Sequence, residues 1–321
     1  MDLQIEPGGR GSKASTHGGS LTVEVVVPTW QRAQWLQRCL KALVAQQRCP
    51  DRIIVVGRAG DDAGHGVVER LTGLPVRWVE VDRSGHIAPV RRGLQEARGE
   101  IVAFLDDDAE PQEGWLDALV QSFTDPSIAC VGGRVITPGF RGRVHLDAGR
   151  VRWYGKYVGN IGALDAPGPV DVDGVMEGNW AWRVDVLRSL EFDPRLDFDD
   201  ASMYGLDLCL QAKTKGHRVV YQPLACVNHH VAPRRHELDR NDRPARTLAY
   251  ARNYTYLSLK HQRGFRRWVF LGWWWLIGDR GAYGLAAGLA DSVLRRDGIG
   301  DLIRASLVGK WKGARLWKST R

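Results

Sequence analysis

The 321-residue chain lacks the features that would export it or lock it by covalent cross-links. Its five cysteines are an odd number, lie far apart, and include no C-x-x-C pair. Such a set argues against a disulfide framework and against a structural zinc site. The first twenty residues are rich in Gly and Ser and have no apolar core of the kind that a secretory signal peptide needs. We therefore expect a cytoplasmic protein with a disordered tail over residues 1–20.

Acidic residues are scarce in the last part of the chain. Residues 231–321 hold 19 Lys and Arg against 7 Asp and Glu, a net charge of +12, whereas residues 1–230 carry −4. The basic segment also contains six of the thirteen tryptophans. Basic residues interleaved with Trp are typical of membrane surfaces and of nucleic-acid interfaces. Because no recognisable nucleic-acid-binding module accompanies the charge, we expect no nucleic-acid partner.

A long apolar run is also missing. The stretch from Trp268 to Gly278 covers eleven residues, whereas a helix that crosses a bilayer needs about twenty. With Arg266, Arg267 and Arg280 around it, this stretch suits the headgroup level of an anionic cytoplasmic leaflet. It also suits a helix packed on the rest of the protein or on a second subunit; the sequence leaves both alternatives open, and we favour the membrane surface.

The first half of the chain alternates short apolar runs with amphipathic stretches. The runs are rich in β-branched residues and apolar on both faces, which indicates a mostly parallel sheet covered by helices on both sides. The expected strands are residues 23–28, 52–57, 76–81 and 101–106, and the expected helices are 35–46, 66–73, 88–97 and 113–123. Residues 128–175 hold Gly-rich strand candidates, residues 203–216 resemble a helix, and the basic segment is expected to be helical.

Polar segments follow three of the expected strands: PTWQR after the first, GRAGDD after the second and DDD after the fourth. Ligands of such sheets bind beyond the carboxyl ends of the strands, so these segments are expected to share one cleft. A run of three aspartates is most often a solvated turn. At a strand end, however, adjacent carboxylates repel one another unless a cation neutralises them. Mg²⁺ and Mn²⁺ prefer carboxylate oxygens and leave positions open for phosphate, so Asp106 and Asp108 are candidate ligands.

Several segments in a fixed order carry a resemblance to a known family. They are VVVPTWQR, IIVV, GLQEARGEIVAFLDDDAEP, VGG, GNWAWR and GLDLCLQAKTKGHRVVYQPLACVNHH. In this order they resemble the family 2 glycosyltransferases, which have the GT-A fold and invert the configuration at the anomeric carbon of the sugar that they transfer. The likeness covers roughly residues 22–235. It implies a nucleotide-sugar transferase domain over residues 21–235, followed by a helical, basic, Trp-rich extension over residues 236–321.

The resemblance implies transfer of a sugar from a UDP-, GDP- or dTDP-linked donor to a glycan, lipid-linked or small-molecule acceptor, assisted by Mn²⁺ or Mg²⁺. It assigns the metal to the carboxylates of Asp106 and Asp108, with His229 as a further metal or diphosphate contact. His229 could equally belong to a simple turn. The positions implied to face the nucleotide or the donor sugar are Pro28, Thr29, Arg32, Asp107 and Asn179. The tryptophans of GNWAWR fit either stacking on a sugar or a place in the core.

The chain departs from the family pattern in two places. Relatives usually carry an aspartate directly after the second strand to hold the nucleobase, whereas here Gly57 stands there. The first acids beyond it are Asp61 and Asp62, and Asp61 is the candidate contact to the nucleotide.

Relatives also place the general base just before DLCL, where this chain has Tyr204 and Gly205. An inverting displacement needs a base at the acceptor hydroxyl. The nearby candidates are Asp207 and, just upstream of it, Asp199 or Asp200, of which we prefer Asp200. A further alternative is an acceptor whose nucleophile, such as a thiol or a phosphate, needs little deprotonation.

Two functions follow from this pattern. The first is an active glycosyltransferase that works in the cytoplasm, with the inner face of the plasma membrane as a site of peripheral contact. The second is a non-catalytic relative that binds nucleotide sugars but has lost the general base. Only the first predicts turnover.

Overall fold

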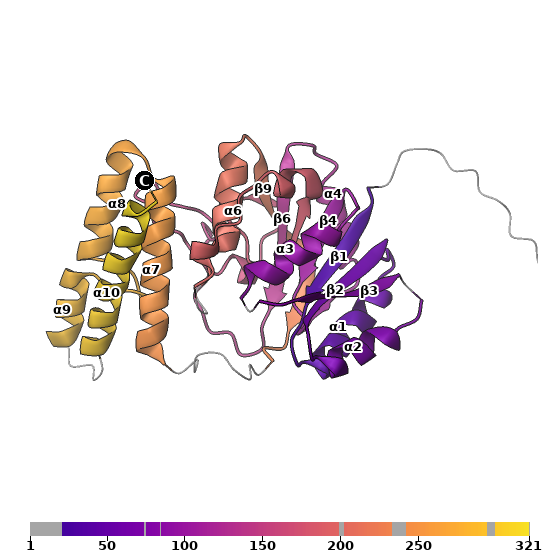
Figure 1. The fold of residues 1–321 in the computed structure, drawn as a ribbon. Coiled ribbons are helices and arrows are strands. Elements are labelled where there is room, and N and C mark those ends of the chain that lie inside the picture. Colours follow the sequence, from indigo (N-terminus) through magenta and orange to yellow (C-terminus); the bar gives the residue numbers. More distant parts are fainter. Residues whose placement is uncertain are drawn as a thin grey trace, which may run out of the picture.

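The computed structural model describes residues 21–73, 75–83, 85–198, 202–232, 242–293 and 299–320. The tail expected over residues 1–20 lies outside this part of the chain. One sheet lies between two layers of helices, and further helices form a bundle beyond one edge of this α/β unit (Figure 1). The strands are β1 (Val23–Pro28), β2 (Arg52–Arg58), β3 (Val76–Val81), β4 (Ile101–Leu105), β5 (Ala109–Pro111), β6 (Ile128–Ile136), β7 (Val170–Asp171), β8 (Asn179–Arg183) and β9 (Arg218–His229).

The sheet has the strand order β3-β2-β1-β4-β8-β6-β9-β5, with β7 paired to β9. Strands β1 to β4 are parallel to one another, as the sequence predicts. Strand β8 runs antiparallel between β4 and β6. Because β1, β2 and β4 are parallel and adjacent, their carboxyl ends meet at one edge of the sheet, which is where the functional residues gather.

Helices cover both faces of the sheet, and each face has its own apolar core. Helices α1, α2 and α4 pack on one face, and α3, α5 and α6 pack on the other. This confirms the predicted mostly parallel sheet between helices. The helices of the sheet domain are α1 (Ala33–Val44), α2 (Asp62–Glu69), α3 (Ile87–Glu96), α4 (Trp115–Ser122), α5 (Val184–Arg188) and α6 (Tyr204–Thr214), with 3₁₀ turns at Ile161–Ala163 and Pro194–Leu196.

One of the strand candidates within residues 128–175 does not form. The stretch 151–159 contains only an isolated bridge between Val151 and Tyr157. The reason is a tight turn at Gly155, whose φ of 93° belongs to the left-handed region that glycine adopts without strain. The amide of Gly155 donates to the carbonyl of Arg152, which closes the turn.

The C-terminal bundle consists of α7 (Arg243–His261), α8 (Gly264–Leu276), α9 (Leu285–Val293) and α10 (Ile299–Lys318). Helix α7 lies between the sheet domain and the other bundle helices (Figure 1). Gly309 and Gly313 allow α10 to approach α7 closely, because a β-carbon at either would overlap a carbonyl oxygen of α7. Trp274 of α8 is fully buried in the bundle. Among the described residues, no helix combines the length and the apolar character needed to span a bilayer.

Candidate functional site

The loops after β1, β2 and β4 meet at the carboxyl edge of the sheet. The hydroxyl of Thr29 donates to Asp107 Oδ2 over 2.7 Å, and the guanidinium of Arg32 donates to Asp107 Oδ1 over 3.0 Å. The amide of Gln31 donates to Asp61 Oδ2 over 2.7 Å. These contacts join all three loops, so the predicted convergence of the polar segments is confirmed.

A three-residue cluster at this edge has the donor set of a divalent metal site. Oxygens of Asp106 and Asp108 and a ring nitrogen of His229 all lie within 4.8 Å of one another. Strand pairing brings the histidine there, since Ala109 of β5 is opposite His229 of β9. Asp106 is exposed, and Asp108 is buried with its Oδ1 3.3 Å from His229 Nε2. Two carboxylates and one imidazole, with an open side at Asp106, fit Mn²⁺ or Mg²⁺.

The neighbours of Asp108 favour the ionised form of its carboxylate. Burial favours the neutral form, but the His229 ring, the amide of Ala232 and the nearby Arg32 outweigh it, so that the pKa of Asp108 lies below its ordinary value. The Ala232 amide donates to Asp108 Oδ2 over 2.8 Å, and Arg32 lies 3.6 Å from the same oxygen. An ionised carboxylate at this position is what a cation requires.

Asp107 takes part in the contacts between the loops. It is 3% exposed, and its two oxygens are those bound by Thr29 and Arg32. Burial raises the pKa of Asp107 to about 6, although Arg32 and Thr29 both favour its charged form. The side chain therefore fixes the position of Arg32, and the sequence alone does not distinguish this role from direct contact with a donor.

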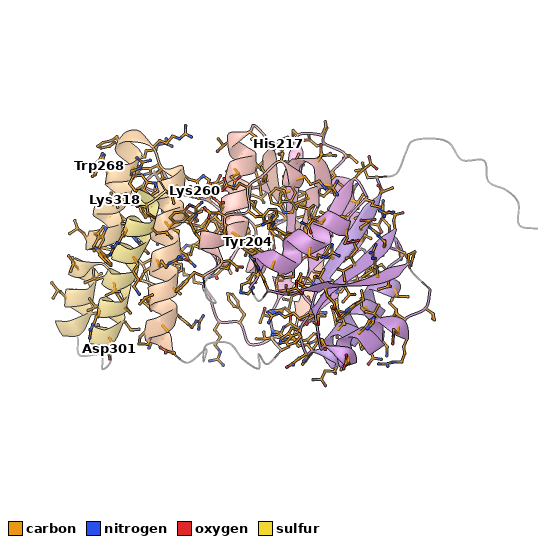
Figure 2. All side chains as sticks on the ribbon, viewed as in Figure 1. Tyr204, His217, Lys260, Trp268, Asp301 and Lys318 are labelled. Carbon is orange, nitrogen blue, oxygen red and sulfur yellow. The ribbon has the colours of Figure 1, made fainter. Side chains whose placement is uncertain are left out.

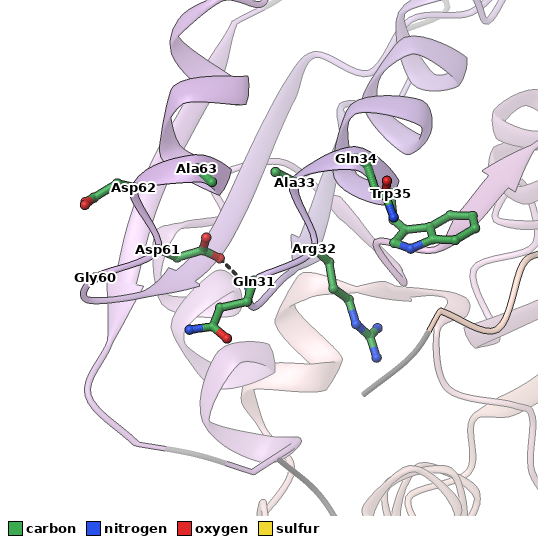
Figure 3. Close-up of a pocket in the computed structure, with 9 residues that line it drawn as sticks. All are labelled: Gln31, Arg32, Ala33, Gln34, Trp35, Gly60, Asp61, Asp62 and Ala63. Carbon is green, nitrogen blue, oxygen red and sulfur yellow. Dashed lines mark hydrogen bonds between the residues drawn. The ribbon is translucent and has the colours of Figure 1, made fainter. Parts of the chain in front are cut away.

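A hollow of about 600 Å³ lies beside the cluster, between the loops after β1 and β2. Arg32, Trp35 and Asp61 are among the residues that line it (Figure 3). Asp61 does not present a free carboxylate, because Oδ1 accepts from the Gly64 amide and caps α2, while Oδ2 holds Gln31. Gln31 has φ of 54°, a left-handed conformation that this bond supports. Pro28 is the last residue of β1 and is followed by this loop.

The missing acid after β2 has a structural explanation. The indole of Trp78 on β3 lies over Gly57, and a β-carbon at Gly57 would overlap its ring. The same indole stacks on His65 of α2 with ring centroids 5.2 Å apart. Aromatic rings thus occupy the space that a side chain at position 57 would take. The cross-strand contact that produces this arrangement is not visible in the sequence.

The structure describes only one of the two main candidate bases, Asp200 and Asp207. Asp200 lies outside the described residues. Asp207 is 1% exposed, and its oxygens contact Lys260 Nζ at 2.8 Å and His261 Nε2 at 2.6 Å. Gln211 Nε2 also donates to Asp207 over 2.8 Å. The structure therefore argues against the prediction that Asp207 is a base, because a carboxylate enclosed by two basic groups of α7 has no oxygen open to an acceptor.

Asn179 is likewise part of the scaffold. It is fully buried, accepts from the indole N–H of Trp115 over 2.8 Å and donates to the carbonyls of Arg134 and Ala225. Trp180 and Trp182 are fully buried as well, and their rings pack edge to face. The predicted contact of Asn179 with the donor sugar does not fit this burial. The alternation of GNWAWR in β8 places it inside the sheet, and its side chain braces three elements.

One acid that the sequence analysis passed over lies beside the start of α6. Glu177 Oε1 accepts from the amide of Gly205 over 2.9 Å. Glu177 lies 28 residues before Gly205 in the sequence, so no local motif indicated this contact.

Comparison with known proteins identifies a family that matches this chain. A family model described as glycosyl transferase family 2 matches residues 24–187, about half of the chain. Pre-mycofactocin glycosyltransferase of Mycobacterium tuberculosis is 27% identical over 249 residues, which are 74% of this chain and 48% of that protein. The chain spans less than half the length of the first curated relatives that it matches.

Solved structures share the fold at low identity. Mannosyltransferase PcManGT from Pyrobaculum calidifontis, in complex with GDP-Man and Mn²⁺, has a TM-score of 0.55 and 17% identity, covering 94% of this chain and 84% of that one. S. aureus TarS 1–349 in complex with UDP-GlcNAc has a TM-score of 0.59 and 15% identity, covering 89% and 79%. The two structures hold different nucleotides.

Proposed function

Because the chain belongs to glycosyl transferase family 2, we propose that it transfers a sugar from a nucleotide-diphosphate donor to a nucleophile on an acceptor, with inversion. The observation that carries the proposal is the cluster of Asp106, Asp108 and His229 at the carboxyl edge of the sheet, next to Arg32. A donor bound there would have its diphosphate beside both groups.

The cluster would hold Mn²⁺ or Mg²⁺ through one oxygen of each aspartate and a ring nitrogen of His229. A bound divalent ion would neutralise negative charge on the leaving diphosphate. The Mn²⁺ in the PcManGT complex supports this assignment. The protein would keep the metal ligands ionised and in position, and the contacts of Asp108 favour its ionised form.

Arg32 would contact the donor phosphates, because Asp107 and Thr29 hold the loop that carries it. The side chain of Arg32 is 19% exposed, so that it can reach a ligand from a fixed position. The nucleoside would lie in the hollow lined by Trp35 and Gly60. Uridine, guanosine and thymidine all remain candidates, since Trp78 stands where an acid would otherwise select the base.

The acceptor is proposed to be a glycan, a lipid-linked sugar or a small molecule. A lipid-linked acceptor would suit the bundle, whose outer surface carries Phe265 at 77% exposure, Trp268 at 71% and Leu289 at 66%. Figure 2 shows Trp268 on the side of the bundle away from the sheet domain. Together with the positive charge of this segment, these side chains would favour an anionic cytoplasmic membrane surface. Trp274 packs inside the bundle, so internal packing of this helix is compatible with the proposed membrane contact of its outer surface.

Nucleotide release and nucleotide binding together test the proposal. Release of UDP, GDP or dTDP should be measured over a panel of nucleotide sugars with Mn²⁺ or Mg²⁺, and binding of the same nucleotides by calorimetry. We expect turnover with at least one donor, and we expect Asp106→Ala and Asp108→Ala to lower metal-dependent binding at least about tenfold.

Asp165→Ala is the matched control, because this carboxylate is 76% exposed and pairs only with Arg134 among its described contacts. Metal-dependent binding without turnover for any donor would favour the non-catalytic alternative. Aspartate variants that bind nucleotide and metal as the parent does would show that the metal assignment is wrong.

A further inference from the structure

Glu177 occupies the space in front of Gly205. This glutamate lies in the segment before β8, and its Oε1 accepts from the Gly205 amide in the first turn of α6 over 2.9 Å. A β-carbon added to Gly205 would overlap the Glu177 carboxylate. The absence of a side chain at position 205 is therefore what makes room for this carboxylate at the start of the helix.

The same segment touches the metal cluster. Gly178 follows Glu177, and its carbonyl accepts from the amide of Asp106 over 3.0 Å. With φ of 85°, Gly178 brings the backbone so close to Asp106 that a β-carbon there would overlap the Asp106 carboxylate. Glu177 is thus one residue from the contact that flanks the cluster, and it is only half-buried.

Four other acids of the sheet domain are engaged with cations or helix ends. Asp207 is enclosed by Lys260 and His261, Asp193 contacts Arg195 and Lys260, and Asp173 pairs with Lys213. Asp197 accepts from the amides of His86 and Ile87 and caps α3. Glu177 differs, since among the described residues the groups that act on it are backbone amides.

We propose that Glu177 is the general base of the transfer reaction, an inference that rests on the proposed function. Its carboxylate accepts the proton of the acceptor hydroxyl while that oxygen forms a bond to the anomeric carbon. The bond from this carbon to the diphosphate oxygen breaks, and the nucleotide diphosphate leaves with the electron pair. The proton stays on Glu177, and the product carries the inverted configuration.

The environment of the carboxylate agrees with this role. Burial raises the pKa of Glu177 above its ordinary value, although the amide of Gly205 favours the charged form. A higher proton affinity makes a carboxylate a stronger base near neutral pH. No cation among the described residues competes for it.

The first test separates a base from a helix cap. Glu177→Gln keeps an oxygen that can accept from Gly205 but removes the basic group. With the best donor of the panel, we expect nucleotide release to water to fall at least about a hundredfold, while nucleotide binding stays within about threefold of the parent. Release should recover to within about tenfold of the parent when sodium azide is added, because azide attacks without losing a proton. Glu69→Gln, an exposed acid of α2, is the control.

The second test moves the carboxylate to the helix. Once Glu177→Ala has emptied the space, Gly205→Asp should place an acid in it, because the backbone at position 205 is helical and its β-carbon points there. We expect Glu177→Ala/Gly205→Asp to release nucleotide at least about tenfold faster than Glu177→Ala/Gly205→Asn, whose side chain has the same shape but is not basic.

The outcomes are distinct. No release by the parent with any donor would refute the proposed function, and this inference with it. Release by Glu177→Gln at the parent's rate would refute the inference alone. Loss of nucleotide binding in Glu177→Gln, or loss of release that azide does not restore, would show that the residue only supports the structure.

Discussion

The buried carboxylate of Asp207 connects the sheet domain to the C-terminal bundle, and its replacement by asparagine should destabilise the protein. Asp207 is in α6, and its partners Lys260 and His261 are in α7. Figure 2 shows Lys260 where α7 faces the sheet domain. Asp207→Asn keeps the shape of the side chain and removes the negative charge that these basic groups surround.

The expected loss follows from the contacts. Two hydrogen bonds to basic groups contribute about 1.5–3 kcal/mol each, and the bond from Gln211 contributes about 1 kcal/mol. The amide of an asparagine can keep some of these bonds, and Lys260 retains its contact with Asp193. We therefore expect a decrease of about 3 kcal/mol in the free energy of unfolding, close to the range for breaking a buried ion pair.

Urea unfolding followed by circular dichroism measures this change, and hydrogen exchange locates it. Exchange should accelerate at the interface between α6 and α7, while kcat at temperatures where the variant is folded should change less than about tenfold. Asp165→Asn should remain within about 0.5 kcal/mol of the parent, because its carboxylate is exposed. A stable Asp207→Asn variant with kcat reduced a hundredfold or more would refute the reasoning and restore Asp207 as a base.

Three further predictions concern other parts of the chain. Asn179→Leu should lower the free energy of unfolding by about 3 kcal/mol, since it leaves the Trp115 indole and two carbonyls without their partner; altered donor binding in a fully stable variant would contradict this. Burial lowers the pKa of Lys310 to about 8 in the folded state, whereas its ordinary value is 10.5. Between pH 8 and pH 10.5 the unfolded state therefore binds more protons than the folded state. Stability of the parent relative to Lys310→Met should therefore rise by about 1.5 kcal/mol from pH 8 to 9.5 in urea titrations, and a constant difference would contradict the assignment. Trp268→Ser should reduce flotation with anionic liposomes about tenfold without changing the melting temperature, whereas Trp153→Ser, a similarly exposed control in the sheet domain, should float like the parent.

Local pattern was enough for the parallel half of the sheet. The apolar runs at 23–28 and 101–105 are buried on both faces, and a run of that kind has few alternatives to a central strand. The stretch 151–159 had the composition of a strand, but Gly155 turns the chain instead. The second helix begins at Asp62, four residues before the expected start, because Asp61 caps it there.

The residues of the candidate site also divide into those that local pattern predicted and those whose role depends on distant contacts. Asp106 and Asp108 were predicted as metal ligands because carboxylates at the end of a buried strand imply a counter-ion, and the structure brings them together with His229. The rule for strand ends also predicted that Thr29 and Arg32 lie near them. Asn179 was misplaced, since the motif around it does not reveal that it faces three buried partners. The positions of Asp207 and Glu177 depend on contacts across 53 and 28 residues, respectively.

The sequence by itself determined the first four strands, the helices between them, and the edge at which polar residues gather, because strand and helix patterns are local and parallel strands share one carboxyl edge. Only the tertiary structure decided which acids are open and which are engaged. Side chains with the same chemistry differ there by their partners: Asp207 lies against two basic groups of α7, whereas Glu177 faces the backbone of Gly205. Packing between distant segments sets that difference, and no local pattern encodes it.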